Sequence, residues 1–377
     1  MKFVFVPDSF KGTLSAVEVC NILDEVRARI LPDSSATLIP VADGGEGTLD
    51  VLHALKLGEF IEIVAHNSFM ESRNSKYLLS DDGVGYIELA DCAGLPEVYD
   101  RRNAMLTTTY GVGEQIKDAV RRGAKKLVIA IGGSSTNDGG AGLACALGAK
   151  FYDVLGREFI PTGGTLSDIA DVDFEPLEKY RDIDISVMCD VDTVLLGEWG
   201  ASAIYGPQKG ATADQVYLLD EGLKRLNDFF IREYCRDYST MTGGGAAGGV
   251  GAGLCAMLGA KLMPGIDVVL NAVDFDTIVS GSDIVITGEG KLDEQSFLGK
   301  VVSGVSKVTR KYSKKLIVIA GLVTDDARLK QSEYGIEKSY ATNPNNLPFE
   351  TVKGRAKEDL YLTAEKAFSD IKNDNLR

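Results

Sequence analysis

Short polar loops that mix glycine, carboxylate and lysine follow several apolar runs of this sequence. The candidate residues in these loops are Asp8, Ser9 and Lys11, then Asp43, Gly44 and Gly45, then Asp190, then Lys209, and finally Gly288, Glu289, Gly290, Lys291 and Asp293. Lysines and backbone N–H groups bind phosphate oxygens, carboxylates hold Mg²⁺, and one carboxylate can accept a hydroxyl proton. The pattern therefore favours phosphoryl transfer, although each charged residue alone is more often a helix cap or a surface charge.

A glycine-rich loop lies at the centre of this pattern. The apolar run 127–131 predicts a strand before it, and the small-residue run 141–149 predicts a helix after it. The candidate binding residues of the loop are Gly132, Gly133, Ser134, Ser135, Thr136, Asn137 and Asp138. Such a loop suits an anion, most naturally phosphate, because glycines let main-chain N–H groups approach closely and the helix start adds positive potential; Asp138 could hold a cation. The alternative interpretation is a tight turn capped by Asn137 or Asp138.

The loop and its helix recur later in the chain. Residues 141–150 resemble residues 252–261, and a second glycine-rich loop precedes the second copy, with Gly248, Gly249 and Gly251 as its candidate binding residues. Two helix starts could surround one polyphosphate, or a phosphate and a carboxylate. The alternative is packing, since small residues also let two helices approach closely.

Several other kinds of site are disfavoured. The sequence contains neither a Walker A loop nor the protein-kinase signature set. Residues 243–248 fit the G-x-G-x-x-G pattern, but they follow a polar stretch instead of a strand, which weakens a dinucleotide interpretation. With only His53 and His66 available, neither a His-ligated metal site nor a Ser-His-Asp triad is expected.

Composition narrows the partners and the location. The net charge of −15 disfavours nucleic acid, which needs clustered Lys and Arg, but not small anions. Six scattered cysteines without a C-x-x-C pair indicate free buried thiols in a reducing compartment. We find no signal peptide and no membrane-spanning apolar run, so the sequence predicts a soluble, cytoplasmic protein. Its expected partners are small-molecule substrates, and neither nucleic acid nor a membrane is expected to bind. The sequence is also compatible with a homo-oligomer.

Both ends of the chain show the same alternation of strand and helix. The middle begins differently, with three short strands near 60–64, 76–79 and 84–89 that have no helices between them and are expected to be antiparallel. The predicted fold class is α/β with two domains. Residues 1–65 and 280–377 form a flavodoxin-like, doubly wound domain, and residues 66–279 form an inserted mixed α/β domain. A ligand is expected in the cleft between them.

Taken together, the loops resemble those of a known family, the type I glycerate kinases. The matching blocks are 8–12, 42–48, 132–134, 136–140, 189–191, 205–211, 248–249, 251–253, 287–291 and Asp293, spread over essentially the whole chain. The resemblance implies ATP-dependent phosphorylation of D-glycerate, usually at the 2-hydroxyl, with Mg²⁺. It also implies two α/β domains, one of them flavodoxin-like.

The resemblance implies roles without assigning each one. Lys11, Lys291 and the two glycine loops would bind phosphates or the glycerate carboxylate, and either loop could take ATP. Four carboxylates are candidates for the Mg²⁺ ligands and the general base: Asp43, Asp190, Glu289 and Asp293. We favour Asp43 or Asp190 as the base, and Glu289 and Asp293 as the metal ligands.

Alternative functions are a kinase that gives 3-phosphoglycerate or acts on another small hydroxy acid, a dinucleotide-dependent oxidoreductase, and a non-catalytic nucleotide sensor.

Overall fold

The structure is a computed structural model that describes residues 1–297 and 299–374. Its chain forms two compact units. Unit 1 contains Met1–Asp43, Asp50–Leu55 and the described residues from Ile266 onward, and unit 2 contains Gly44–Leu49 and Lys56–Gly265. The strands and helices are mixed α/β in both units, which confirms the predicted fold class.

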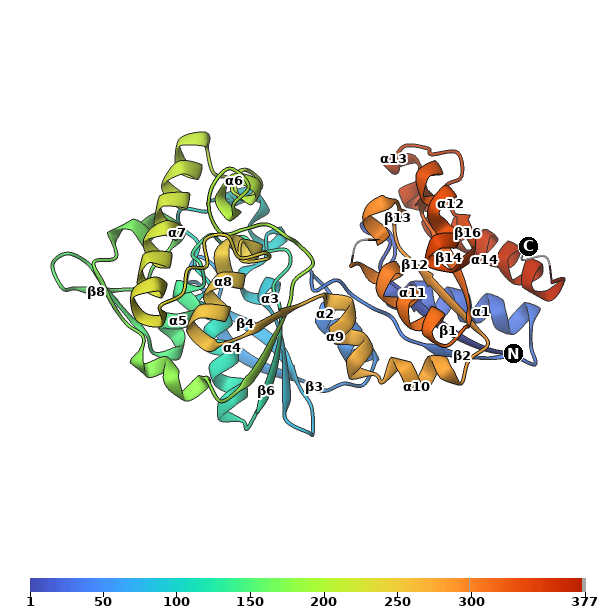
Figure 1. Ribbon diagram of the computed structural model, residues 1–377, viewed down its shortest axis with the longest axis horizontal. Helices are drawn as coiled ribbons and strands as arrows, with labels where there is room; N and C mark the ends of the chain where they lie inside the picture. Colours follow the sequence, from blue (N-terminus) through green and yellow to red (C-terminus); the bar gives the residue numbers. More distant parts are fainter. Residues whose placement is uncertain (298, 375–377) are drawn as a thin grey trace. The chain divides into compact units, whose positions relative to one another are not determined.

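Unit 1 is built on a five-stranded parallel sheet. Its strands, in spatial order, are β2 (Ser35–Leu38), β1 (Lys2–Pro7), β12 (Ile284–Gly288), β14 (Lys315–Ala320) and β16 (Ile336–Ala341). Numbered along the unit, this order is 2-1-3-4-5, the flavodoxin-like arrangement. The strand order therefore agrees with the doubly wound fold expected from the sequence (Figure 1).

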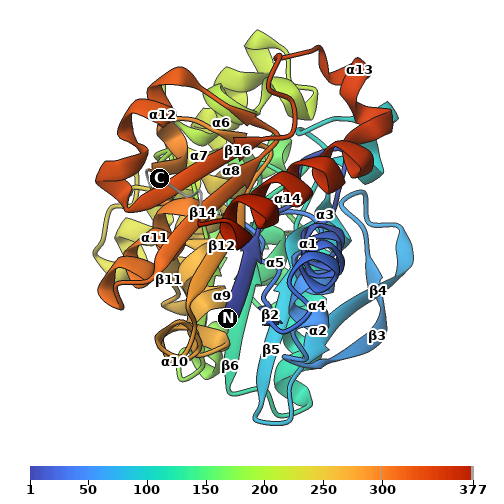
Figure 2. The same cartoon turned by 90° about the vertical axis from the view of Figure 1, so that its right-hand side faces the viewer.

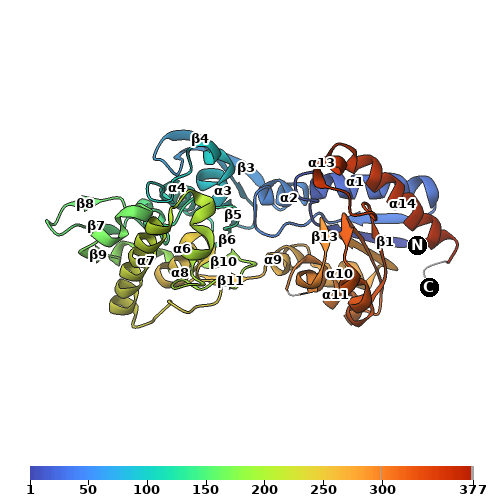
Figure 3. The same cartoon turned by 90° about the horizontal axis from the view of Figure 1, so that it is seen from above.

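Helices alternate with these strands along the chain. They are α1 (Ala16–Ile30), α2 (Thr48–Ala54), α9 (Gly265–Ala272), α10 (Phe275–Ser280), α11 (Val301–Lys311), α12 (Asp325–Lys330), α13 (Phe349–Val352) and α14 (Ala356–Lys372). Helices α1 and α14 lie side by side (Figure 2). Seen from above, they are on one side of β1, with α10 and α11 on the other (Figure 3). A short parallel pair, β13 (Lys291–Leu292) and β15 (Leu322–Val323), follows the ends of β12 and β14.

Local sequence signals explain how these elements begin and pack. The Ser15 side chain accepts from the Glu18 N–H and the Glu18 side chain accepts from the Ser15 N–H, so the two residues form a capping box at the start of α1. The apolar residues of β1 and β12 are buried against α1 and α14, with Phe3 and Phe5 packing on Phe368. This core fixes the strands whose ends carry the candidate site.

Unit 2 contains a six-stranded mixed sheet. Its spatial order is β11 (Lys261–Met263), β10 (Asp184–Met188), β6 (Lys126–Ala130), β5 (Val84–Glu88), β4 (Ser72–Leu79) and β3 (Glu59–His66). The first four strands are parallel, whereas β3, β4 and β5 form the predicted antiparallel meander. A small antiparallel sheet is formed by β7 (Lys150–Tyr152), β8 (Glu158–Phe159) and β9 (Asp171–Asp173).

The helices of unit 2 surround one large apolar core. They are α3 (Leu89–Ala93), α4 (Tyr110–Arg121), α5 (Ala141–Leu147), α6 (Ala201–Tyr205), α7 (Ala213–Tyr234) and α8 (Ala246–Leu258). No helix in the described part of the chain is long and apolar enough to cross a membrane. The six cysteines are free, as expected, but Cys235 is exposed and not buried.

The division between the units differs from the sequence-based boundaries. Residues 59–65, which the sequence places in the terminal domain, lie in β3 and pair along their whole length with β4 of unit 2. At the other end, Ile266 already belongs to unit 1, because its side chain packs against Gly304 of α11. Strand pairing and helix packing therefore move the boundaries to the segments around 43–56 and 265–266.

Candidate active site

Three polar loops of unit 1 meet where the strand order reverses. In the parallel register, Pro7 is opposite Gly288, and the Asp8 N–H donates to the Gly288 carbonyl over 2.8 Å. On the other side of β1, the Val41 N–H donates to the Pro7 carbonyl over 3.0 Å. Asp8, Asp43 and Glu289 therefore follow neighbouring strand ends at the switch point between β1 and β12. Ligands bind at this position in open parallel sheets.

Carboxylates at this switch point interact with one another and with Lys11. The Lys11 ammonium contacts an Asp43 carboxylate oxygen over 2.9 Å, and the Ser9 N–H donates to Asp8 over 2.6 Å. Burial raises the pKa of Asp8 to about 7, and the negative charges of Asp43 and Glu289 raise it further. The hydrogen bond from the Ser9 N–H and the charge of Lys11 oppose this rise. Asp8 is 9% exposed, so its negative charge has little compensation from water.

Glu289 is the second carboxyl group poised near neutral pH. Burial raises the pKa of Glu289 to about 7, Ser296, Lys300 and Lys11 oppose the rise, and Asp293 adds to it. Burial also raises the pKa of Asp293, but the neighbouring Lys291, at 3.1 Å, and the Gln295 N–H outweigh it, so the pKa ends below its usual value. Of the groups predicted in this loop, Glu289 is thus the one whose charge interacts with Asp8 and Lys11.

The glycines of these loops allow close packing. A Cβ on Gly288 would stand 2.0 Å from the Ile319 carbonyl oxygen, and one on Gly290 would reach the Lys11 backbone nitrogen at 3.5 Å. Gly288 therefore serves the contact between β12 and β14, and Gly290 lies against the first loop.

The carboxylate pair fits a divalent cation. Among the residues that the structure describes, Glu289 Oε1 is buried without a hydrogen-bond partner. Burial raises the pKa values of Asp8 and Glu289, and Lys11 offsets only part of the effect, so further positive charge would stabilise both carboxylates. A bound cation would supply that charge. The described residues contain no cluster of three or more His, Cys, Asp or Glu side chains arranged to hold a metal alone. Such a site suits an ion that takes only one or two protein carboxylates and completes its shell with phosphate and water, as Mg²⁺ does.

In unit 2, the glycine-rich loop after β6 lies beside the loop that begins at Gly44. The Gly132 N–H donates to the Gly44 carbonyl over 2.9 Å, and a Cβ on Gly132 would meet the Gly45 Cα at 2.7 Å. Glu88, at the end of β5, accepts from the backbone N–H groups of Gly47 and Leu49. Glu88 therefore fixes this loop, a role that its place after the apolar Tyr86–Ile87 pair alone does not reveal.

Lys209 is buried inside the same loop. Its ammonium nitrogen is 2.8 Å from Ser134 Oγ and 2.6 Å from the Thr136 carbonyl oxygen, and the residue is 2% exposed. Burial lowers the pKa of Lys209 to about 7, and the negative charge of Asp138 opposes this fall. Lys209 thus holds the shape of the loop from within.

Asn137 and Asp138 are also fully buried. Asp138 accepts hydrogen bonds from the N–H and hydroxyl of Thr109 and from the N–H groups of Gly140 and Gly142, and burial raises its pKa. Asn137 donates to Ser202 Oγ over 3.0 Å. The Asp138 oxygens are occupied by protein donors, so the structure favours a loop-shaping position over the expected cation contact.

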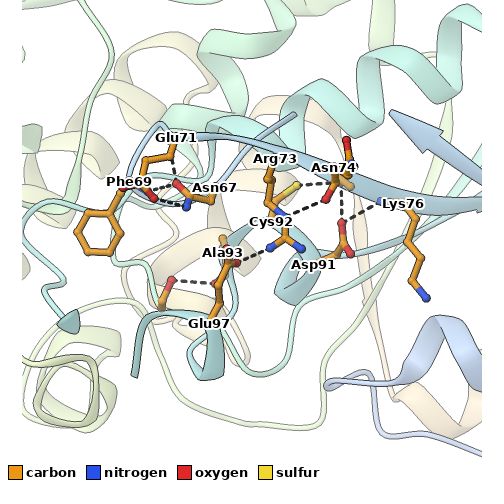
Figure 4. A network of polar contacts seen from close by, with 12 residues as sticks. Asn67, Phe69, Glu71, Arg73, Asn74, Lys76, Asp91, Cys92, Ala93 and Glu97 are labelled. Atoms are coloured by element: carbon orange, nitrogen blue, oxygen red, sulfur yellow. Dashed lines mark hydrogen bonds and ion pairs between the residues drawn. The ribbon is translucent and has the colours of Figure 1, made fainter. Parts of the chain in front are cut away.

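The start of the loop is anchored to α3. Ser135 donates to the Ala93 carbonyl through both its N–H and its hydroxyl, at 2.8 and 2.9 Å. Helix α3 is in turn tied to β4, because Asp91 accepts from Ser75 Oγ and from the Lys76 N–H. Figure 4 shows this polar network around Asp91, Cys92 and Ala93. A chain of hydrogen bonds thus connects the antiparallel strands to the glycine loop.

The second glycine segment packs directly on the first. The Gly139 N–H donates to the Gly248 carbonyl over 3.0 Å, and a Cβ on Gly248 would stand 2.1 Å from the Thr136 carbonyl oxygen. Cβ atoms on Gly249 and Gly251 would likewise meet Leu223 at 2.9 Å and the Gly243 carbonyl at 2.5 Å. The repeat therefore brings two glycine-rich backbones together, which is the packing alternative left open by the sequence.

Asp190 follows β10 in unit 2. One carboxylate oxygen accepts from the Gly265 N–H over 2.8 Å, and the side chain is half-buried.

The predicted site residues fall into two groups according to the unit that contains them. Asp8, Ser9, Lys11, Asp43, Glu289, Lys291 and Asp293 lie in unit 1, and Gly44, Gly45, Asp190, Lys209 and the glycine loops lie in unit 2. Lys300, beside Glu289, is a charged neighbour absent from the sequence-based set.

A flavodoxin-like sheet with carboxylates and a lysine at its switch point defines an α/β protein equipped to bind small phosphorylated ligands. Comparison with known proteins makes this specific. The model of the glycerate kinase family matches residues 3–372. The glycerate kinase of Bacillus subtilis (strain 168) is 40% identical over 375 residues, covering 99% of this chain and 98% of the relative.

Two further comparisons agree. The glycerate 2-kinase of Escherichia coli (strain K12) is 41% identical over 344 residues, 90% of each chain. A crystal structure from Salmonella typhimurium LT2, provisionally named glycerate kinase 2, superposes with a TM-score of 0.87 at 36% identity and covers 100% of both chains. The chain therefore belongs to the glycerate kinase family. Membership makes it an ATP-dependent kinase that acts on small molecules.

Proposed function

We propose that the chain transfers the γ-phosphoryl group of ATP to the 2-hydroxyl of D-glycerate, with Mg²⁺ as the metal ion. The relative named glycerate 2-kinase supports the position of transfer. The structural observation that carries the proposal is the cluster of Asp8, Lys11, Asp43 and Glu289 at the β1/β12 switch point. It combines the charged parts that phosphoryl transfer needs.

Each charged group of the cluster has a distinct task in this proposal. Asp8 and Glu289 would hold Mg²⁺, because both are buried carboxylates that added positive charge would stabilise. Asp293, paired with Lys291, would add negative charge beside Glu289. Bound Mg²⁺ would neutralise phosphate charge. Lys11 would bind a phosphate oxygen and stabilise the charge that develops on the transferred group.

The chemical step needs one proton acceptor. As the glycerate hydroxyl oxygen bonds to the γ-phosphorus, the bond from that phosphorus to the β–γ bridging oxygen breaks and ADP leaves. Asp43 would take the hydroxyl proton, since its carboxylate is partly exposed and contacts Lys11. Asp190 is the alternative base. The glycine loop 132–140 would supply a rigid wall for glycerate or phosphate, held from inside by Lys209.

Lys11→Ala is expected to reduce turnover more than tenfold while leaving the melting temperature almost unchanged. The Lys11 side chain is 77% exposed, and exposed ion pairs contribute little to stability. Steady-state kinetics and thermal unfolding measure the two effects. Near-normal turnover would remove Lys11 from the site, and Lys307→Ala, at an exposed position on α11, is the matched control.

The function itself is tested with ATP, Mg²⁺ and D-glycerate. We expect ADP release that requires glycerate, and phosphorus NMR should show 2-phosphoglycerate as the product. A 3-phosphoglycerate signal would correct the position of transfer. Nucleotide binding without turnover on any hydroxy acid would contradict the kinase proposal.

A further inference from the structure

A cavity of about 600 Å³ lies at the carboxyl end of the edge strand β16 in unit 1. Its lining comes from residues 338–341 of β16, the loop 342–347, α12, α13, Arg355 and α14. This volume is within the range of small-molecule sites. It is also larger than a three-carbon acid needs. Within the described chain, none of the lining residues belongs to the carboxylate cluster described above.

The cavity is locally basic in an acidic protein. Its lining includes four cations, Arg328, Lys338, Arg355 and Lys366, against one acidic side chain, Asp359. Arg355 pairs with Asp359 at 2.7 Å, and Lys338 pairs with Asp370 at 3.0 Å. Arg328 and Lys366 are exposed and form no ion pair within the described residues, although Lys366 interacts electrostatically with Asp370. The lining therefore offers positive charge to an anion although the chain carries a net charge of −15.

Part of the cavity lining is apolar. Leu347 and Leu362 line it with 41% and 55% of their surface exposed, next to Val352. Asn343 fixes the loop, because its amide donates to the Leu347 carbonyl and its side-chain oxygen accepts from the Leu347 N–H, each over 2.9 Å. A ligand with a flat apolar part as well as negative charge would use both features, whereas a phosphorylated three-carbon acid would leave the apolar part of the lining uncovered.

The cavity is connected to the candidate active site through the backbone. The Asn343 N–H donates to the Gly321 carbonyl over 2.8 Å, and the Gly321 N–H donates to the Glu289 carbonyl over 3.1 Å. Strands β12 and β16 are separated by β14 alone, so their carboxyl ends are about 10 Å apart. An elongated ligand in the cavity could extend toward the carboxylates at the switch point.

We propose that this cavity binds a nucleoside polyphosphate, with its base against Leu347 and Leu362 and its negative charge near Arg328 and Lys366. The inference rests on the proposed kinase function, which supplies such a ligand. The nucleotide has two sources: the ATP that donates the phosphoryl group, or a second, regulatory nucleotide. The continuity with Glu289 favours the donor.

Charge reversal separates these sources. The double variant Arg328→Glu/Lys366→Glu is compared with Lys307→Glu, which reverses an exposed charge on α11. Calorimetric titration with ADP measures affinity and stoichiometry, and steady-state kinetics measure KM for ATP and for glycerate. For a donor site, the double variant should weaken ADP binding and raise KM for ATP by about tenfold, with KM for glycerate unchanged. The control should match the wild type.

The remaining outcomes are also decisive. Loss of a second ADP equivalent with unchanged KM for ATP would support a regulatory nucleotide in the same cavity and overturn the donor assignment. Unchanged ADP affinity and unchanged KM for ATP in the folded double variant would overturn the proposal, while glycerate turnover by the wild type would leave the kinase function standing. If the wild type did not phosphorylate glycerate, the kinase function would fail and ADP titration would still test the cavity.

Discussion

Asp8→Asn is expected to lower kcat for glycerate phosphorylation by about 10²-fold or more. Asp8 is buried at the β1/β12 switch point beside Asp43, Lys11 and Glu289, and an amide there could not supply the charge that we propose holds Mg²⁺. If Asp8 is a metal ligand as proposed, the KM for Mg²⁺ should rise as well. Asp33→Asn is the matched control, since Asp33 is exposed in the same unit.

The same substitution should stabilise the metal-free protein at alkaline pH. Burial and neighbouring carboxylates raise the pKa of Asp8 to about 7 in the fold, from an ordinary value near 4. The protonated form therefore contributes stability that is present below about pH 4 and is lost as the pH rises to about 7. Asparagine has no such loss, so at pH 8 in EDTA the variant should be more stable by about 1–3 kcal/mol.

Urea unfolding at pH 5 and pH 8 measures this effect. The stability gain of Asp8→Asn over the wild type should be larger at pH 8 than at pH 5. Equal gains at both pH values would show that Asp8 is not the buried, electrostatically strained carboxylate described here. Added Mg²⁺ should raise the melting temperature of the wild type more than that of the variant.

Gly248→Ala should destabilise the protein by about 3 kcal/mol or more. A Cβ at Gly248 would stand 2.1 Å from the Thr136 carbonyl oxygen and 2.5 Å from the Asn137 Cα, and neither backbone can move without opening the glycine loop. Gly259→Ala is a closely matched control. Its φ of +68° is almost the +69° of Gly248, but nothing lies within 4 Å of its Cβ position.

The comparison separates backbone strain from steric contact. Left-handed φ should cost Gly259→Ala only about 1 kcal/mol, and the larger loss at Gly248 then measures the contact between the two glycine segments. Thermal and urea unfolding give both values. Similar losses in the two variants would contradict the packing of the second glycine segment on the first.

Local signals in the sequence were sufficient for much of the fold. The apolar runs at both ends predict the buried strands β1, β12 and β14, and Ser15 with Glu18 predicts the start of α1. The grouping of both chain ends into one α/β body also follows from the repeated alternation of strand and helix. These features depend on periodicity and capping, which act over a few residues.

Positions that depend on pairing between distant segments of the chain could not be predicted from local sequence signals. The register that opposes Pro7 and Gly288 sets Asp8 beside Glu289, yet the two carboxylates are far apart in the chain. Likewise, Lys209 looks like a phosphate ligand in the sequence, but in the structure its amine is buried on Ser134 and Thr136. Whether a polar residue faces a ligand or a loop interior is decided by tertiary packing.

The glycine repeat illustrates the same limit of local reasoning. Glycine permits both anion binding and close backbone contact, so composition alone left both interpretations open. The close approach of Gly248 to Thr136 and of Gly253 to Gly139, whose carbonyl oxygen is 2.0 Å from the Cβ position, identifies packing as one use of the repeat. The ligand contacts of the loop 132–140 stay a prediction.

The most direct test of the central claim, that phosphoryl transfer occurs at the β1/β12 switch point, is a parallel phosphorus NMR time course of wild type and Asp8→Asn. Each sample contains ATP, Mg²⁺ and D-glycerate at saturating concentrations. The wild type should convert the γ-phosphate signal of ATP into 2-phosphoglycerate, and Asp8→Asn should form product at about one hundredth of that rate or less. Equal rates of 2-phosphoglycerate formation by the two folded proteins would contradict the claim.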